Sequence, residues 1–501
     1  MPRAACPVPA AARPQTNGTG GVIHMTTNAR REAAPAAETS EYFEKRSLAQ
    51  GSVSWVMLMG LGVAYAISGD FSGWNYGIAQ GGWVGMLIAF LVMGAMYLFM
   101  SFGLAEMSCA MPTAGAGYAF ARRAMGKVGG AFTGFAILVD FAICPAAIST
   151  FIADYVHALG WFSNVPSALI IAVFFAVFVG LQIVGVGEAL KVTFGITLIA
   201  VAALVVFAVG ITPSFSVGNL FDIAPAASGA SEALPFGVSG VIAALPFGMW
   251  LFLGVEGVPL AAEEARDPER DMPRGIIGAM LLLFITGFAA VMLVTGGAGA
   301  LFAGTAAAPL VDALNEVGAP GFAAFVNVAG LAGLVASFFS CIYSASRQAF
   351  ALSRAGYLPK FLSYTGSRKT PFVSLVVLGV IEVVLAVGIG NGSALLNMAV
   401  FAACVSYAMM NLSHILLHLH EPQMERAFVA PGGIALTSIS LVLALVALVS
   451  TFFVDVVAAG CTLAVLVALM VYFFVYSRHH LVANAPDEEF AALAAAEAEL
   501  A

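Results

Sequence analysis

About twelve long apolar stretches, separated by short polar connections, dominate this chain of 501 residues. A run of about 20 predominantly apolar residues can cross the hydrocarbon core of a bilayer as one α-helix. Hydrophobic residues make up 61% of the sequence and charged residues 10%, a balance that excludes an ordinary soluble domain. We therefore predict an all-α polytopic membrane protein of about twelve transmembrane helices. The predicted spans are 52–78, 82–108, 128–158, 166–184, 188–210, 238–260, 274–296, 322–345, 372–389, 393–416, 433–454 and 457–477.

Lysine and arginine fall on one side of this predicted bundle. The connections 211–237 and 296–321, on the opposite side, contain acidic residues but no Lys or Arg. Basic connections stay on the cytoplasmic side of a membrane. We therefore expect a multi-pass protein of the plasma membrane, the inner membrane in a bacterium, with both termini in the cytoplasm. The basic residues are Lys45, Arg46, Arg122, Arg123, Lys127, Lys191, Arg266, Arg270, Arg274, Arg347, Arg354, Lys360, Arg368, Lys369, Arg426 and Arg478.

Two of the predicted spans are interrupted. In the first, the apolar run 53–66 is followed by a segment, 68–73, of two serines, two glycines, Asp70 and Phe71. In the sixth, Glu256 lies between Gly254 and Gly257. Exposed backbone and an unpaired carboxylate are costly in hydrocarbon, because no water is present to bond them. Two interrupted helices in corresponding positions predict a transporter of inverted repeats with its site near the bilayer midplane.

The spacing of the two interruptions predicts the domain organisation. Repeat one would cover 52–210 and repeat two 238–416, in a 5+5 arrangement with helices 1 and 6 broken, and two extra helices would occupy 433–477. The transporter domain is thus expected over 49–480. The tails 1–48 and 481–501 are expected to be cytoplasmic, the first of them disordered because it is rich in Ala, Pro and Thr.

Three cytoplasmic connections contain motifs that resemble the amino acid–polyamine–organocation superfamily of permeases. They are 112–118, with its Gly-Ala-Gly-Tyr, then 262–274 and 346–359. The segments 68–82 and 253–264 are similar to the ethanolamine permease branch of that superfamily. The resemblance covers about residues 50–480. It implies the LeuT-like fold of two inverted five-helix repeats, with the substrate between helices one, three, six and eight.

Asp70 points to the kind of substrate. Amino acid carriers of this superfamily hold the substrate carboxylate on the backbone N–H groups of the first broken helix, where the half-helix dipole favours an anion. A fixed charge at Asp70 would repel that carboxylate by on the order of several kcal/mol. We therefore expect a small cationic amine without a carboxylate, such as ethanolamine. Alternatively, Asp70 only caps the second half-helix.

Glu256 and Asp140 are the other acidic residues expected at membrane depth near the site. Glu256 could exchange a proton during transport, or could bond the free N–H groups of the broken helix. Asp140 could pair with the ammonium or hold a proton, or could bond groups freed by Pro145. Aromatic residues beside the breaks could contact the ammonium through their rings or simply pack. The expected substrate-binding residues are Ser68, Gly69, Asp70, Phe71, Ser72, Asp140, Trp250, Phe252 and Gly254, and the expected proton-coupling residues are Glu256 and Asp140.

The remaining polar residues give weaker indications. Lys191 lies at the start of span five, and some relatives carry a lysine that mimics a coupling ion deeper in this helix, so a carboxylate is expected as the coupling group instead. H⁺ is the expected coupling ion, and Na⁺ is the alternative, with Ser337 and Ser340 among the residues that could supply oxygens. We expect Glu106, Asp154 and Glu188 at wetted span ends and structural roles for Glu382 and Asp455. His414 and His418 share a helix face, but His420 does not, so no metal site is expected. The six cysteines are scattered singly, without a CxxC pair.

The sequence therefore predicts a secondary transporter rather than an enzyme. It has no nucleotide-binding loop and no Ser–His or His/Asp metal pattern of a membrane enzyme. The expected partners are a small amine, membrane lipid and H⁺, with no cofactor and no nucleic acid. The alternative function within the same superfamily is an amino acid or polyamine permease or exchanger.

Overall fold

The computed structural model describes residues 53–112, 115–184, 186–226, 229–366 and 370–482, with the side chains of 186–192 and 263 outside the description. Within these ranges the chain is helical, which confirms the predicted fold class. The α-helices are α2 (Trp55–Ala66), α3 (Ser68–Phe71), α4 (Asn75–Ala110), α5 (Ala116–Ala158), α6 (Ser167–Val184), α7 (Val186–Ile211), α8 (Gly237–Trp250), α9 (Pro268–Ala298), α10 (Ala300–Thr305), α11 (Pro309–Glu316), α12 (Pro320–Arg354), α13 (Phe372–Ile389), α14 (Gly392–His420), α15 (Gly433–Val454) and α16 (Val456–Val475). The 3-10 helices are η1 (Thr212–Ser214), η2 (Val217–Phe221), η3 (Val255–Glu264), η4 (Lys360–Ser363) and η5 (Ser477–His479).

Eleven helical segments of the described chain are long and apolar enough to span a membrane, and the first predicted span is the exception. The expected helix 52–78 is wrong at its end, because the chain leaves the helix after Phe71 and α4 begins at Asn75. Ser72 is extended (φ −160°) and Gly73 has φ +98°, a conformation that an L residue adopts only at a cost. The interruption therefore shortens the first span to Trp55–Phe71.

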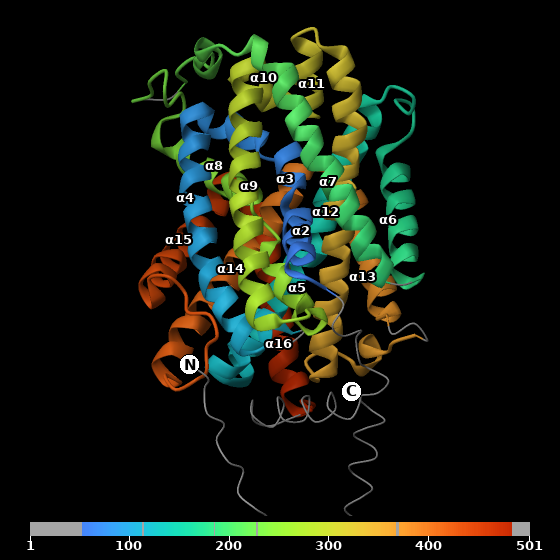
Figure 1. The fold of residues 1–501 in the computed structure, drawn as a ribbon, viewed down its shortest axis with the longest axis vertical. Helices are drawn as coiled ribbons and strands as arrows, with labels where there is room; N and C mark the ends of the chain where they lie inside the picture. Colours follow the sequence, from blue (N-terminus) through green and yellow to red (C-terminus); the bar gives the residue numbers. More distant parts are fainter. Residues whose placement is uncertain (1–52, 113–114, 185, 227–228, 367–369, 483–501) are drawn as a thin grey trace, which may run out of the picture.

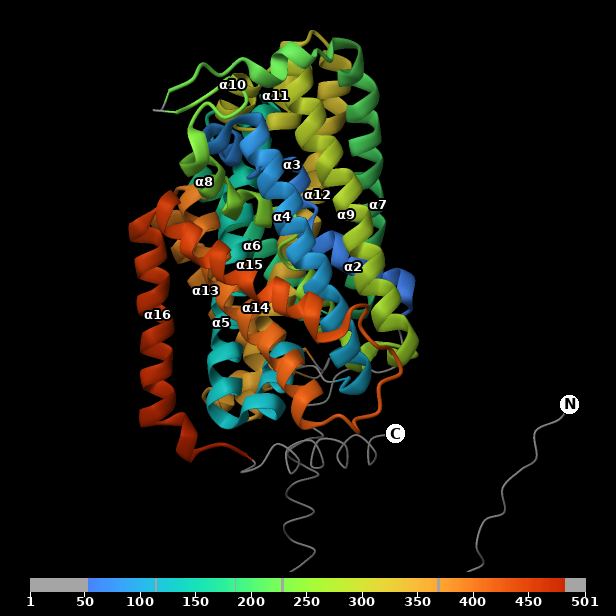
Figure 2. The ribbon, with the colours of Figure 1, turned by 90° about the vertical axis from the view of Figure 1, so that its left-hand side faces the viewer.

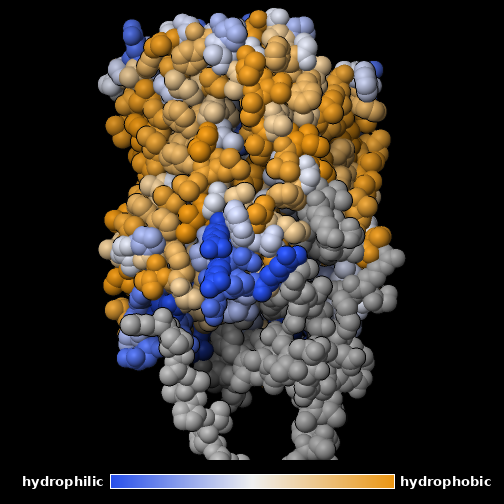
Figure 3. Space-filling view, in the orientation of Figure 1, coloured by the Kyte–Doolittle hydropathy of each residue, from blue (hydrophilic) through white to orange (hydrophobic). Residues whose placement is uncertain are grey.

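The most buried helices lie in the middle of the bundle. The apolar part of α5 is 94% buried within the protein and that of α14 is 83% buried, whereas α15 and α16 are each only 28% buried. Figure 1 shows α6 at one margin of the bundle and Figure 2, turned by 90°, shows α16 at another, with α5 and α12 running through the interior. Figure 3 shows a broad hydrophobic belt with hydrophilic side chains gathered below it. The exposed apolar faces of the outer helices thus suit contact with lipid.

The two interrupted segments meet at the lower end of the molecule. The backbone N–H of Val53, just before α2, donates to the carbonyl of Glu264 at the end of η3 (3.0 Å). The N–H of Arg266 donates back to the carbonyl of Val53 (3.0 Å), which gives a single parallel bridge between Val53 and Ala265. The entrance of the first broken helix and the exit of the second are therefore joined.

Candidate substrate and coupling site

The second interruption is a clear break in the helix. α8 ends at Trp250, the chain turns through 251–254, and η3 continues from Val255. Gly254 has φ +106°, and a Cβ there would lie 2.9 Å from the Cβ of Tyr65, so the position requires glycine. Its backbone N–H donates to Oε2 of Glu256 (3.1 Å). Glu256 thus bonds a group freed by the break, as one of the sequence interpretations predicted.

The first interruption is narrower and is bridged by a hydroxyl. Ile67 keeps helical angles (φ −61°, ψ −22°), so α2 and α3 are nearly continuous. The Ser337 hydroxyl of α12 donates to the Ala64 carbonyl (2.5 Å) and accepts the Ser68 N–H (2.9 Å). Ser337, considered from sequence only as a Na⁺ ligand, therefore satisfies the backbone at this break.

Side chains from three elements bond the carbonyl groups freed after α3. The Trp74 indole N–H donates to the Asp70 carbonyl (3.2 Å), the Tyr155 hydroxyl to that of Phe71 (2.9 Å) and the Trp250 indole N–H to that of Ser72 (3.0 Å). Each bond replaces the water that a membrane interior lacks. Trp250 is thus a hydrogen-bond donor to the first break. The sequence analysis did not identify Tyr155, one turn before the end of α5, because nothing in the sequence links it to that break.

The two breaks touch through Gly69. A Cβ at this position would lie 2.8 Å from the Cα of Leu251 and 2.9 Å from the carbonyl oxygen of Trp250. Real Cβ atoms essentially never approach this closely, so the absence of a side chain lets the two backbones meet. Gly69 therefore acts in the contact between the breaks.

Asp70 is buried on the side of the first break that faces α9. Its carboxyl lies against Thr286 and Gly287, with Oδ1 3.2 Å from the place of a Cβ on Gly287. Neither carboxyl oxygen has a hydrogen-bond partner of normal geometry among the described residues. Because an unpaired buried carboxylate is costly, this group needs a proton or a cation.

A second acidic group lies apart from Asp70, where α5 passes η3. The carboxyl of Asp140 lies near that of Glu256, and the hydroxyl of Tyr407 also lies near Glu256. Neither Asp140 oxygen has a hydrogen-bond partner of normal geometry among the described residues. Tyr97 of α4 donates its hydroxyl proton to Tyr407 (2.8 Å), which leaves the Tyr407 proton free to face Glu256. Two carboxylates repel strongly in a low-dielectric interior, so the pair is most stable with one proton between them. The structure thus brings the two expected coupling residues together.

The phenylalanines beside the breaks pack against other rings. Phe71 meets Tyr155 edge to face, with centroids 6.4 Å apart. Phe252 lies 5.3 Å from Phe90 and 6.0 Å from Phe284, measured between ring centroids. These contacts fit the packing interpretation of the two residues.

The three permease-like connections contact one another, and the Tyr118 ring of the first meets the Tyr357 ring of the third edge to face, with centroids 5.7 Å apart. Glu264 forms a buried salt bridge with Arg347 of α12 and accepts the Tyr343 hydroxyl (3.0 Å). The Arg347 guanidinium also stacks 3.7 Å from the centroid of the Tyr343 ring. Arg122 bonds Tyr357 in the same region. This network therefore holds the end of η3 against the last turns of α12.

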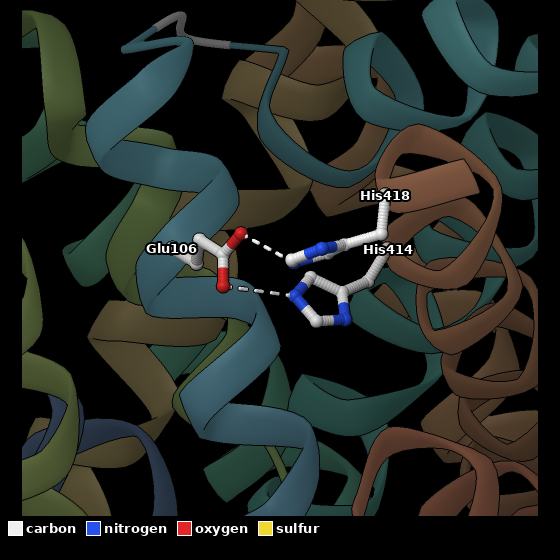
Figure 4. A group of neighbouring side chains, drawn as sticks. All are labelled: Glu106, His414 and His418. Atoms are coloured by element: carbon white, nitrogen blue, oxygen red, sulfur yellow. Dashed lines mark hydrogen bonds and ion pairs between the residues drawn. The ribbon is translucent and has the colours of Figure 1, made fainter. Parts of the chain in front are cut away.

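Glu106 corrects the expectation of a wetted span end. It is 1% exposed, and its carboxylate lies 3.2 Å from His414, 2.6 Å from His418 and 2.7 Å from the Arg426 guanidinium. Figure 4 shows the two imidazoles of α14 converging on the carboxylate from α4. The N–H of Ala430 also donates to it (2.7 Å).

The spacing of this group would suit a metal ion, since the three ligand atoms of Glu106, His414 and His418 lie within 4.8 Å of one another. The carboxylate oxygens are nevertheless already bonded by Arg426 and Ala430, and a guanidinium opposes a second cation. We interpret the group as an anchor between α4, α14 and the connection to α15. We call it the Glu106 anchor.

The remaining sequence candidates are distributed as follows. Asp154 is half-buried and lines a separate cavity of about 440 Å³ with Tyr76 and Asn391. Asp455 caps α16 by accepting two N–H bonds, which confirms its structural role. Glu382 is buried in α13 without a hydrogen-bond partner in the described chain. The side chains of Glu188 and Lys191 lie outside the described residues.

Two cysteines that are far apart in sequence meet in the interior. The thiol sulfurs of Cys144 on α5 and Cys341 on α12 are 3.3 Å apart and not bonded to each other. The two helices pack side by side, which brings these two free thiols together although 197 positions separate them in the sequence.

Comparisons with known proteins agree with this architecture. The family model described as amino acid permease matches residues 55–486. A methylthioribose transporter of Bacillus subtilis is 25% identical to this chain, and the alignment covers 92% of this chain and 97% of the transporter. A branched-chain amino acid permease of the same organism is 26% identical, with 79% of this chain and 86% of the permease aligned. An aromatic amino acid transport protein of Escherichia coli is 27% identical, with 72% of this chain and 80% of that protein aligned.

Proposed function

The chain belongs to the amino acid permease family and is a membrane transporter, not an enzyme, and we propose that it imports a small cationic amine such as ethanolamine. The observation that supports this substrate is Asp70, a buried carboxyl without a hydrogen-bond partner of normal geometry in the described chain, beside the contact between the two breaks. An ammonium group can neutralise it, whereas a substrate carboxylate would be repelled.

The amino acid relatives favour a second candidate, an amino acid permease of the same family. Its substrate has a carboxylate as well as an ammonium. That carboxylate would need positive or N–H groups near the first break, where the Ser68 N–H is already bonded by Ser337. We therefore prefer the amine, and keep the amino acid as the alternative that the experiment below must separate.

We further propose that transport is coupled to H⁺ through Asp140 and Glu256. The proton held by the adjacent carboxyls would be released on one side of the membrane and taken up on the other as the breaks rearrange between two inverted repeats. The hydroxyl of Tyr407 can donate to Glu256 when the pair loses its proton, which stabilises that state.

Sidedness follows from the basic connections. The ends that contain Arg122, Arg266 and Arg347 would face the cytoplasm under the positive-inside rule. The Glu264–Arg347 salt bridge would then close the cytoplasmic side of the carrier, and its opening would release substrate.

The experiment that tests the substrate is uptake into proteoliposomes with a competition panel of ethanolamine, choline, alanine, leucine and putrescine. We expect uptake of labelled ethanolamine, little competition by alanine or leucine, and loss of uptake in Asp70→Asn. Glu382→Gln is the matched control, since it neutralises another buried carboxyl without a hydrogen-bond partner in the described chain, away from the breaks. Uptake of leucine instead of ethanolamine, or normal ethanolamine uptake by Asp70→Asn, would refute the assignment.

A further inference from the structure

A groove of about 600 Å³ lies at the lower end of the bundle between α2, α9 and the segment that connects α14 to α15. Its apolar wall is formed by Trp55, which is 39% exposed, together with Ile277 and Phe428. Its polar rim contains Arg270, Arg274 and Glu269. We call it the α2–α9 groove.

The two arginines lie on one face of α9. They are four residues apart, about one helical turn, and both are exposed. Arg270 has only a long contact of 3.8 Å with Asp267 across exposed side chains, and Arg274 has no ion pair among the described residues. Figure 3 shows strongly hydrophilic side chains over the lower end of α9, directly below the hydrophobic belt. The rim of the groove therefore carries two guanidinium groups and one carboxylate, directly below the hydrophobic belt.

The walls of the groove are held in place by α4. Arg426 and Ala430 both bond Glu106, so the Glu106 anchor fixes the two ends of the segment that contains Ala427 and Phe428. The thiol of Cys109, one turn further along α4, donates to the carbonyl of Glu269 at the start of α9 (3.2 Å). The groove is thus preformed and does not need its ligand to order it.

We propose that the α2–α9 groove binds the phosphate head group of an anionic phospholipid of the cytoplasmic leaflet. Two guanidinium groups one turn apart can both bond a phosphodiester, and Glu269 on the same rim disfavours a second negative charge. The apolar wall accepts the start of an acyl chain, which a free phosphate lacks. This site rests on the proposed sidedness but is independent of the proposed substrate.

The position of the groove connects it to transport. Trp55 is the first residue of α2, and α9 follows η3 after three residues, so the bound lipid would contact the start of the first interrupted segment and the start of the helix that follows the second. These ends are already joined by the Val53–Ala265 bridge. A lipid at this place would stabilise the joined arrangement and shift the conformational equilibrium toward it.

The test is native mass spectrometry of the purified full-length protein titrated with phosphatidylglycerol, phosphatidylcholine or glycerol 3-phosphate. We expect one phosphatidylglycerol to bind preferentially, and binding about thirtyfold weaker in Arg270→Ala/Arg274→Ala, since each arginine near an anionic head group contributes about a factor of five. Arg266→Ala is the matched control, because this exposed arginine of the same connection does not line the groove.

Three results would overturn the proposal. The first is equal binding of phosphatidylglycerol and phosphatidylcholine, and the second is unchanged phosphatidylglycerol binding in the double variant. The third is competition by glycerol 3-phosphate at the same concentration, which would identify a soluble phosphate as the ligand. A photoreactive residue in place of Ile277 gives an independent readout: a cross-link to lipid supports the proposal, and a cross-link to another part of the chain contradicts it.

Discussion

Replacement of Gly69 by alanine tests the contact between the two breaks. The added Cβ would lie 2.8 Å from the Cα of Leu251, about 0.6 Å short of the 3.4 Å at which ordinary contact begins. The obstructing atoms belong to the backbone, so rotation of a side chain cannot relieve the overlap. Overpacking of this kind destabilises a protein by about 1–3 kcal/mol. We therefore expect Gly69→Ala to fold with reduced thermal stability and to lose most of its transport activity.

The assay compares Gly69→Ala with Gly195→Ala in the same detergent and the same proteoliposomes. Gly195 lies in α7 with no atom near the position of its Cβ, so alanine there should leave transport unchanged and should not lower stability, since alanine has the higher helix propensity. Thermal unfolding measures how much stability is lost when the added Cβ pushes the two breaks apart. Substrate uptake measures how much transport activity is lost with it. Equal stability and equal uptake in the two variants would refute the close contact between the backbones of 69 and 251.

Four further substitutions test other parts of the structure. Glu256→Gln should abolish accumulation driven by a pH gradient but retain exchange of substrate across the membrane, and unchanged accumulation would remove Glu256 from coupling. Arg347→Ala should lower the melting temperature strongly, because an unpaired buried charge costs about 3–5 kcal/mol; removal of Glu264 as well should restore part of the loss. Ser337→Ala should cost about 1–3 kcal/mol by leaving the Ser68 N–H without its acceptor, as measured by thermal unfolding, with Ser337→Thr as the control. Glu106→Gln should increase proteolysis of the 421–432 connection, and an unchanged cleavage pattern would contradict the anchor.

The sequence determined the class of the protein and the places where its helices are interrupted. Apolar length and the distribution of Lys and Arg act locally along the chain, so span positions can be counted without knowing which helices touch. The break at Gly254 can also be located from sequence, because glycine is the residue that most readily adopts a positive φ. The end of the first span was misplaced because the chain leaves the helix after Phe71, where Tyr155 and Trp250 from other helices bond the freed carbonyl groups of Phe71 and Ser72.

Which polar groups face each other became known only from the packing of the helices. From sequence, Asp70, Asp140 and Glu256 were three separate carboxyls at membrane depth; the fold pairs Asp140 with Glu256 and turns Asp70 toward α9. Glu106 was expected at a wetted span end and is a buried anchor, because α14 and the connection after it supply its partners. Burial and pairing are set by residues hundreds of positions away, and single-chain periodicity contains no information about them.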